Sequence, residues 1–106
     1  MKKTVKDLFE FIKNSPCCYQ AVDEIRKRLL EAGFTELFEQ EAYEIKEGGK
    51  YFVTRNGSSL IAFVMPKGRP DGMHIMAAHS DSPSFKLKEN MNMLSKPYVR
   101  LNVEKY

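Results

Sequence analysis

The pair His79 and Asp81, separated by one residue, is the part of the sequence best suited to chemistry. In an extended segment residues i and i+2 point to the same face, so the imidazole and the carboxylate are expected to project together. A metal-bound histidine commonly donates its other ring N–H to an acid, which fixes its tautomer. The pair therefore indicates one metal ligand with its orienting acid. A histidine near a turn, followed by an Asp that caps the next segment, would show the same pattern.

The rest of the sequence supplies no complete metal site. A catalytic zinc needs about three protein ligands and an open position. His74, the only other histidine, lies five residues before His79, an odd offset that places it on the opposite strand face, so we interpret it as structural. Cys17 and Cys18 are adjacent, and adjacent cysteines rarely satisfy disulfide geometry. Neither has a histidine close in sequence that could act as its base. They are expected to be reduced, inert thiols of a cytoplasmic protein.

A buried strand is expected to position His79. Residues 73–78 are mostly apolar on both faces, which is typical of a central strand covered on both sides. His79 would then lie at the carboxyl end of that strand, where open α/β sheets bind ligands. Upstream, Asn56-Gly57 separates two β-rich runs, 50–55 and 58–65, and predicts an antiparallel hairpin because both residues tolerate the positive φ of a type I′ turn.

Two amphipathic helices are expected before the hairpin. Thr4 followed by Asp7 predicts a capped start for the first helix, and Ser15-Pro16 predicts the start of the second, which would end at Gly33. Their apolar stripes are Val5, Leu8, Phe9 and Ile12 in the first helix, and Val22, Ile25, Leu29 and Ala32 in the second. The predicted fold class is α/β, with two N-terminal helices followed by a small mixed β-sheet.

Composition and charge restrict the class of protein. The 106 residues, 42% of them hydrophobic, fit one ordinary domain. The longest apolar run, 60–65, is far shorter than the roughly 20 residues of a membrane span, so no membrane partner is expected. The net charge is +3, and the basic and acidic residues are interspersed along the sequence. This pattern argues against a nucleic-acid partner, although a weak nucleic-acid binder remains an alternative.

The last stretch of the sequence predicts a half-buried strand, because Val99, Leu101 and Val103 alternate with polar residues. Its unprotected end favours a fragment of a longer protein.

Four stretches, in order, resemble one family. Ala78-His79-Ser80-Asp81-Ser82-Pro83, with residues 85–88, resembles the Ala-His-Thr-Asp-Ser-Pro motif of the aspartyl aminopeptidases, the M18 family of zinc metallopeptidases. Residues 15–34 are similar to the family's early helix, and residues 48–58 are similar to its hairpin. Val103-Glu104-x-Tyr106 is similar to the lead-in to its Gly-Gly pair. Together the matches cover nearly the whole chain.

The resemblance implies a function and roles for two residues. His79 would bind one zinc of a two-zinc site, and Asp81 would be the catalytic-site acid that orients its imidazole. The remaining ligands and the general base would lie beyond Tyr106. Such enzymes remove an N-terminal amino acid, often Asp or Glu, from a peptide with a metal-activated water. Gln20 and Tyr43 stand where the family usually has histidine and tryptophan, so the role of that histidine is not carried over.

The resemblance also implies an organisation for the chain. Residues 1–106 would be the N-terminal portion of the catalytic domain and inactive alone. Residues 97–106 would form a strand leading toward a dimerisation domain that this chain does not contain, and the full-length enzyme would be a homo-oligomer. The alternative is a non-catalytic binding or assembly module with a peptidase-like fold, which a full-length product without further Asp, Glu and His ligands would favour.

Overall fold

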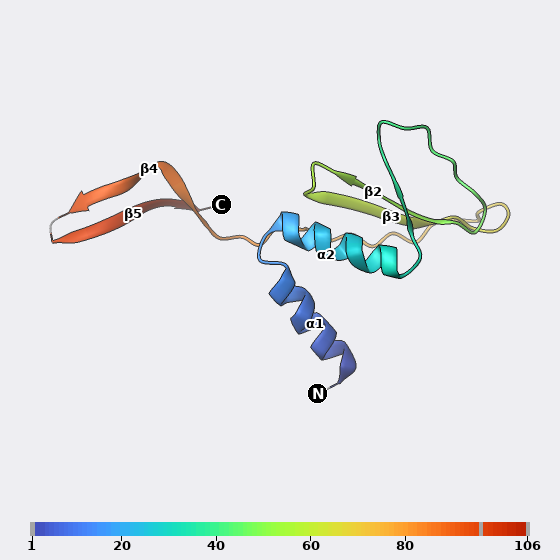
Figure 1. The fold of residues 1–106 in the computed structure, drawn as a ribbon, viewed down its shortest axis with the longest axis horizontal. Helices are drawn as coiled ribbons and strands as arrows, with labels where there is room; N and C mark the ends of the chain where they lie inside the picture. The colour runs from blue at the N-terminus through green and yellow to red at the C-terminus, as the bar shows by residue number, and fades with distance from the viewer. Residues whose placement is uncertain (1, 96, 106) are drawn as a thin grey trace.

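The computed structural model describes residues 2–95 and 97–105, which form two helices and two separate sheets (Figure 1). The elements are α1 (Lys3–Asn14), α2 (Cys18–Glu31), β1 (Thr35–Leu37), β2 (Lys50–Arg55), β3 (Ser59–Val64), β4 (Phe85–Ser95) and β5 (Tyr98–Lys105). One sheet has the order β1-β2-β3, and the other pairs β4 with β5. The predicted α/β class, two helices followed by a small mixed sheet, is confirmed.

The predicted hairpin is present as β2 and β3, which pair antiparallel with Tyr51 opposite Phe63. Asn56 and Gly57 have φ values of 52° and 64°, and the Ser58 N–H donates to the Arg55 carbonyl at 3.2 Å. Positive φ at both central residues is what a type I′ turn requires. The parallel pairing of β1 with β2 was not predicted, because three residues are too few to show a periodic pattern.

Helix α2 ends where the sequence predicted and is fastened to the sheet. Gly33 has a φ of 82°, its N–H donates to the Leu30 carbonyl at 3.0 Å, and the Phe34 N–H donates to the Leu29 carbonyl at 2.9 Å. These two bonds form a Schellman cap. Two further residues, Arg26 and Glu36, join α2 to β1 through a two-pronged ion pair with contacts of 2.7–3.0 Å.

The predicted helix starts were wrong. Helix α1 begins at Lys3, because the Lys2 carbonyl already accepts the Val5 and Lys6 N–H groups, and no side chain caps it. Thr4 is therefore inside the helix. Helix α2 begins at Cys18 rather than at Pro16, since Cys17 is extended and its carbonyl accepts the Ala21 N–H.

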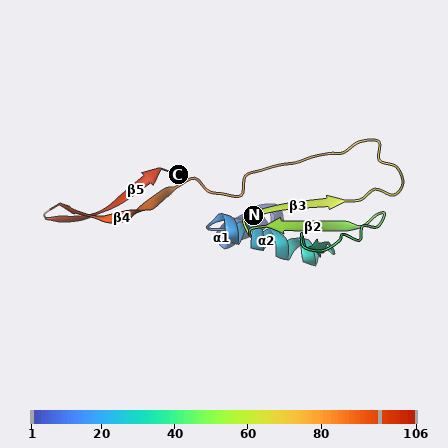
Figure 2. The ribbon, with the colours of Figure 1, turned by 90° about the horizontal axis from the view of Figure 1, so that it is seen from above.

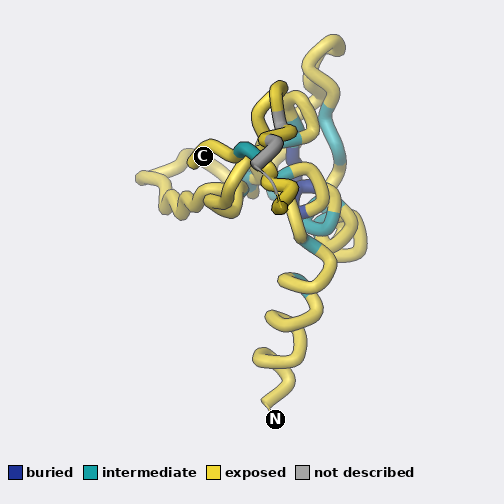
Figure 3. Tube along the Cα trace, turned by 90° about the vertical axis from the view of Figure 1, so that its left-hand side faces the viewer, coloured by how far each residue is buried: buried dark blue, intermediate teal, exposed yellow. Residues whose placement is uncertain are grey.

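The buried core is small. Among the described residues it consists of Ala21 and Val22 of α2 and Tyr51 and Phe52 of β2 (Figure 3). The radius of gyration is 19.8 Å, whereas a compact domain of this length would have about 13 Å. The difference arises because α1 and the β4–β5 hairpin extend away from the α2–sheet body (Figures 1 and 2). The expected apolar stripe of α1 is consequently exposed.

The strand predicted at 73–78 is absent, and this prediction was wrong. Residues 73–78 are extended but unpaired, and Met73, Ile75 and Met76 are 82%, 77% and 99% exposed. A central strand needs hydrogen-bonded neighbours and covering layers, and no other described element pairs with this segment.

The last predicted strand is present as β5, but its expected buried face is wrong. Val99, Leu101 and Val103 are exposed because the β4–β5 hairpin does not pack on the helix–sheet body (Figure 2). Tyr106, which the prediction included in this strand, lies outside the described residues. Neither helix of the described chain has the length and apolar character needed to cross a membrane.

Candidate metal-ligand site

His79 and Asp81 lie in the extended segment between β3 and β4. This segment leaves β3 through the loop 66–72, which has no regular structure, as its prolines and glycines predicted. It then runs back along β3 before it reaches β4 (Figure 2). The two residues therefore follow an extended but unpaired segment, not the paired strand that the sequence predicted.

The structure brings the two side chains together. His79 Nδ1 lies 2.8 Å from the main-chain oxygen of Asp81 and 3.1 Å from its Oδ1. Both oxygens are acceptors, so Nδ1 is the ring nitrogen that carries the proton, and Nε2 of the neutral imidazole keeps its lone pair. This is the tautomer that a metal ligand binding through Nε2 requires.

The pair is solvent-accessible and anchored through the residue between its members. The side chains of His79 and Asp81 are 76% and 52% exposed. Ser80 is half-buried, and its Oγ donates to the Ser58 carbonyl at 2.8 Å. No sequence signal indicated this contact, because Ser58 is 22 residues away in the hairpin turn.

These residues fit one ligand position of a zinc site, not a complete site. Nε2 of the exposed His79 side chain is a suitable nitrogen donor, with Asp81 as its supporting acid. Within residues 2–95 and 97–105, no group of three His, Cys, Asp or Glu side chains is placed to hold a metal ion. His74 is exposed and belongs to no such group.

The other residues singled out from the sequence lie apart from this pair. Cys17 and Cys18 are free thiols. The Cys17 thiol donates to Gln20 Oε1 at 3.3 Å, so the residue at the family's histidine position is engaged with its own helix start. Tyr43 is exposed in the segment between β1 and β2.

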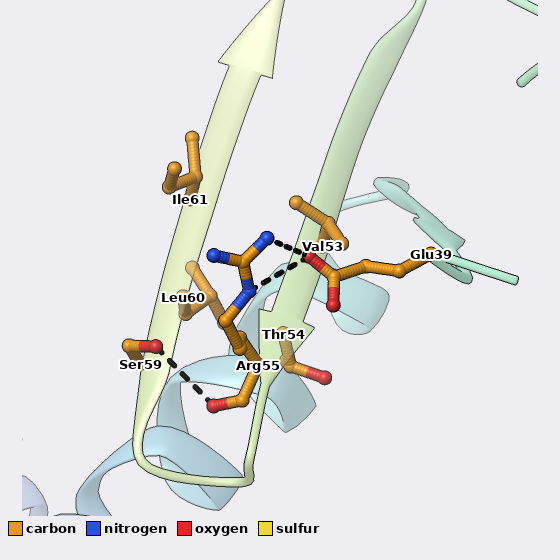
Figure 4. A pocket seen from close by; sticks show the side chains of 7 residues that line it. All are labelled: Glu39, Val53, Thr54, Arg55, Ser59, Leu60 and Ile61. Atoms are coloured by element: carbon orange, nitrogen blue, oxygen red, sulfur yellow. Dashed lines mark hydrogen bonds and ion pairs between the residues drawn. The ribbon is translucent and has the colours of Figure 1, made fainter.

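A hollow of about 170 Å³ on the β2–β3 hairpin contains no residue of the His79 segment (Figure 4). It is lined by Glu39, Val53, Thr54, Arg55, Ser59, Leu60 and Ile61. Arg55 crosses it and donates to Glu39 Oε1 at 2.6 and 2.9 Å, and this hydrogen bond raises the pKa of Arg55. The two charged groups of this hollow are therefore paired with each other.

Comparison with known proteins identifies the family. The family model described as aminopeptidase I zinc metalloprotease (M18) matches residues 11–106. The chain belongs to the M18 family. The M18 chain is 44% identical over 112 residues to a probable M18 family aminopeptidase 2 of Clostridium novyi, a match that covers 100% of this chain. It is 34% identical over 102 residues to a probable aspartyl aminopeptidase of Ricinus communis, which covers 94% of this chain.

A solved structure agrees with this assignment. The S. cerevisiae mApe1 dodecamer matches the M18 chain with a TM-score of 0.80 and 26% identity over 98% of the chain. The chain spans only about a quarter of each of these proteins: 26% of the Clostridium protein, 21% of the Ricinus protein and 25% of the yeast protein.

Proposed function

We propose that residues 1–106 are the N-terminal portion of the catalytic domain of a zinc-dependent M18 aminopeptidase, in which His79 is one metal ligand. The observation that carries the proposal is the contact of His79 Nδ1 with Asp81, at 2.8 Å to its main-chain oxygen and 3.1 Å to its carboxylate. This contact holds the proton on Nδ1 and leaves Nε2 free to bind a metal.

The two residues have different roles in the proposed site. Bound zinc supplies a water molecule of lowered pKa and polarises the carbonyl of the peptide bond to be cleaved. Asp81 accepts the Nδ1–H, which makes Nε2 a better donor and fixes the ring orientation. Asp81 therefore acts through His79 rather than on the peptide. A second zinc ion, the other ligands and the general base would come from residues beyond Tyr106.

The substrate and the assembly are part of the same proposal. The substrate is a peptide with a free N-terminus, and the name of the Ricinus relative, probable aspartyl aminopeptidase, supports an acidic first residue. The dodecamer of the yeast protein supports a homo-oligomer. Residues 97–106 would lead toward a dimerisation domain. The two free cysteines, Cys17 and Cys18, favour the reducing cytoplasm.

The test compares this chain with the product of the complete source reading frame. The complete product is expected to release the first residue of peptides that begin with Asp or Glu, to lose that activity on chelation, and to regain it with zinc. The 106-residue chain should show no release under the same conditions, because among its described residues no group of three possible ligands is placed to hold a metal ion. A complete product that retains full activity after chelation would refute the proposal, and so would one that lacks peptidase activity.

A further inference from the structure

Ser80 faces away from the pair that flanks it. In an extended segment alternate residues point to opposite faces, and His79 and Asp81 contact each other while Ser80 Oγ donates to the Ser58 carbonyl at 2.8 Å. Residues 73–84 form no strand pairing in this structure. A side-chain hydrogen bond therefore ties this stretch to the hairpin at the position of the proposed ligand.

The acceptor of this bond belongs to a well-defined turn. Asn56 and Gly57 are both in the left-handed region, and the Ser58 N–H closes the turn on the Arg55 carbonyl at 3.2 Å. The turn also lies against α2, because a Cβ added at Gly57 would be 3.7 Å from Tyr19 Cδ1. The Ser58 carbonyl, which accepts the Ser80 hydroxyl, thus belongs to a turn that lies against the start of α2.

We infer that Ser80 is a positioning residue, whose hydroxyl sets the place of the His79 imidazole relative to the α2–sheet body. One face of the segment then carries His79 and Asp81, and the other face carries the Ser80 hydroxyl that bonds to the hairpin turn. This inference rests on the proposed function, since His79 is the group that is positioned. It predicts that a hydroxyl is required at residue 80, so that threonine can replace serine and alanine cannot.

The test places a paramagnetic probe on His79 and observes the turn. The probe is Cu²⁺ held by iminodiacetate, which binds an exposed imidazole. The chain carries His74→Gln, Cys17→Ser and Cys18→Ser so that other strong donors are removed. Broadening of the Gly57 and Ser58 amide signals then reports whether His79 stays near the turn. A His79→Gln variant measures the broadening that does not depend on His79, and this background is subtracted from the broadening of the other chains.

The matched variants are Ser80→Ala, Ser80→Thr and Ser82→Ala. Ser80→Ala should lose the His79-dependent broadening at the turn, whereas Ser80→Thr and Ser82→Ala should keep it. Equal broadening in Ser80→Ala and the parent chain would overturn the inference. If Ser80→Ala unfolds the hairpin, the test is a nuclear Overhauser contact between Ser58 and Ser80 in the unmodified chain. The inference predicts this contact, and its absence would overturn the inference.

An activity measurement separates this inference from the proposed function. In the complete product, Ser80→Ala should lower zinc affinity about tenfold, which is the smallest loss typical of removing a group that supports a metal ligand. Ser80→Thr should retain the zinc affinity of the unmodified protein. Unchanged zinc affinity in Ser80→Ala, with activity that still depends on zinc, would refute the positioning role and leave the proposed function standing. A complete product without peptidase activity would refute the proposed function while the copper experiment still tests Ser80.

Discussion

His79 and Asp81 contact each other twice, since Nδ1 of the imidazole lies 2.8 Å from the Asp81 main-chain oxygen and 3.1 Å from its carboxylate. The main-chain contact does not depend on the identity of residue 81. The carboxylate contact does, and it adds a negative charge beside the ring. The two contributions can therefore be separated by substitution.

Asp81→Ala is expected to weaken the tautomer preference of His79 without abolishing it. In the unmodified chain the neutral ring should carry its proton mainly on Nδ1, as long-range ¹H–¹⁵N spectra can show. Asp81→Asn keeps an oxygen acceptor without the charge, so its tautomer preference should lie between those of the unmodified chain and Asp81→Ala. In the complete product, Asp81→Ala should reduce metal affinity about 10–100-fold. A ring that is mainly protonated on Nε2 in the unmodified chain would contradict this account.

Gly33→Ala should destabilise the chain by about 1–2 kcal/mol, because the φ of 82° at this position is unfavourable for a residue with a Cβ. The space around Gly33 is open, so the effect would come from backbone conformation alone. Gly72→Ala is the matched control, since it also has open space but no positive φ. Urea unfolding should show a loss for Gly33→Ala and none for Gly72→Ala; equal effects would contradict the prediction.

Phe52→Ala should remove about 3–5 kcal/mol of stability. Phe52 is 0% exposed and is the largest fully buried side chain of the described residues. Because the core is small, this loss should unfold most molecules at room temperature, which circular dichroism would show. Ile61→Ala, on the neighbouring strand but 67% exposed, should change stability by less than about 0.5 kcal/mol. A folded Phe52→Ala chain would show that stability resides elsewhere.

The Asp23–Lys27 pair predicts a pH-dependent contribution to stability. The hydrogen bond from Lys27, at 2.7 Å, lowers the pKa of Asp23. A carboxylate whose folded pKa is lowered adds stability above its unfolded pKa and loses that contribution as the pH falls through the folded value. Asp23→Asn should therefore be less stable than the parent chain near neutral pH, and the two should converge in acid.

The measurement is the free energy of unfolding of both chains across the acid range. Because the Asp23–Lys27 pair is exposed, salt should reduce the difference at neutral pH. Asp71→Asn, an exposed loop substitution, controls for the removal of one carboxylate. A difference between Asp23→Asn and the parent chain that persists unchanged in strong acid would contradict the assignment.

Local features of the fold were predictable from the sequence. Asn56-Gly57 specified the hairpin and Gly33 specified the end of α2, because each needs a backbone conformation that few residues adopt. The closeness of His79 and Asp81 was also expected from their spacing. These features depend on neighbours in sequence, so no distant part of the chain had to be known.

Features that depend on distant partners were not predictable. The apolar pattern of 73–78 is typical of a central strand, but in the described chain the segment pairs with no strand, not even with the edge strand β3, along which it runs. The Ser80 contact with Ser58 joins residues 22 apart, and a serine between two site residues gives no indication of its partner. Periodicity describes which faces are apolar and not what covers them.

The most direct test of the central claim is the zinc content of the complete product with and without His79. We predict that His79→Ala loses one zinc ion per chain relative to the unmodified protein and loses peptidase activity. His74→Ala, which replaces the exposed histidine outside the site, should retain both. Unchanged zinc content and unchanged activity in His79→Ala would contradict the assignment of His79 as a metal ligand.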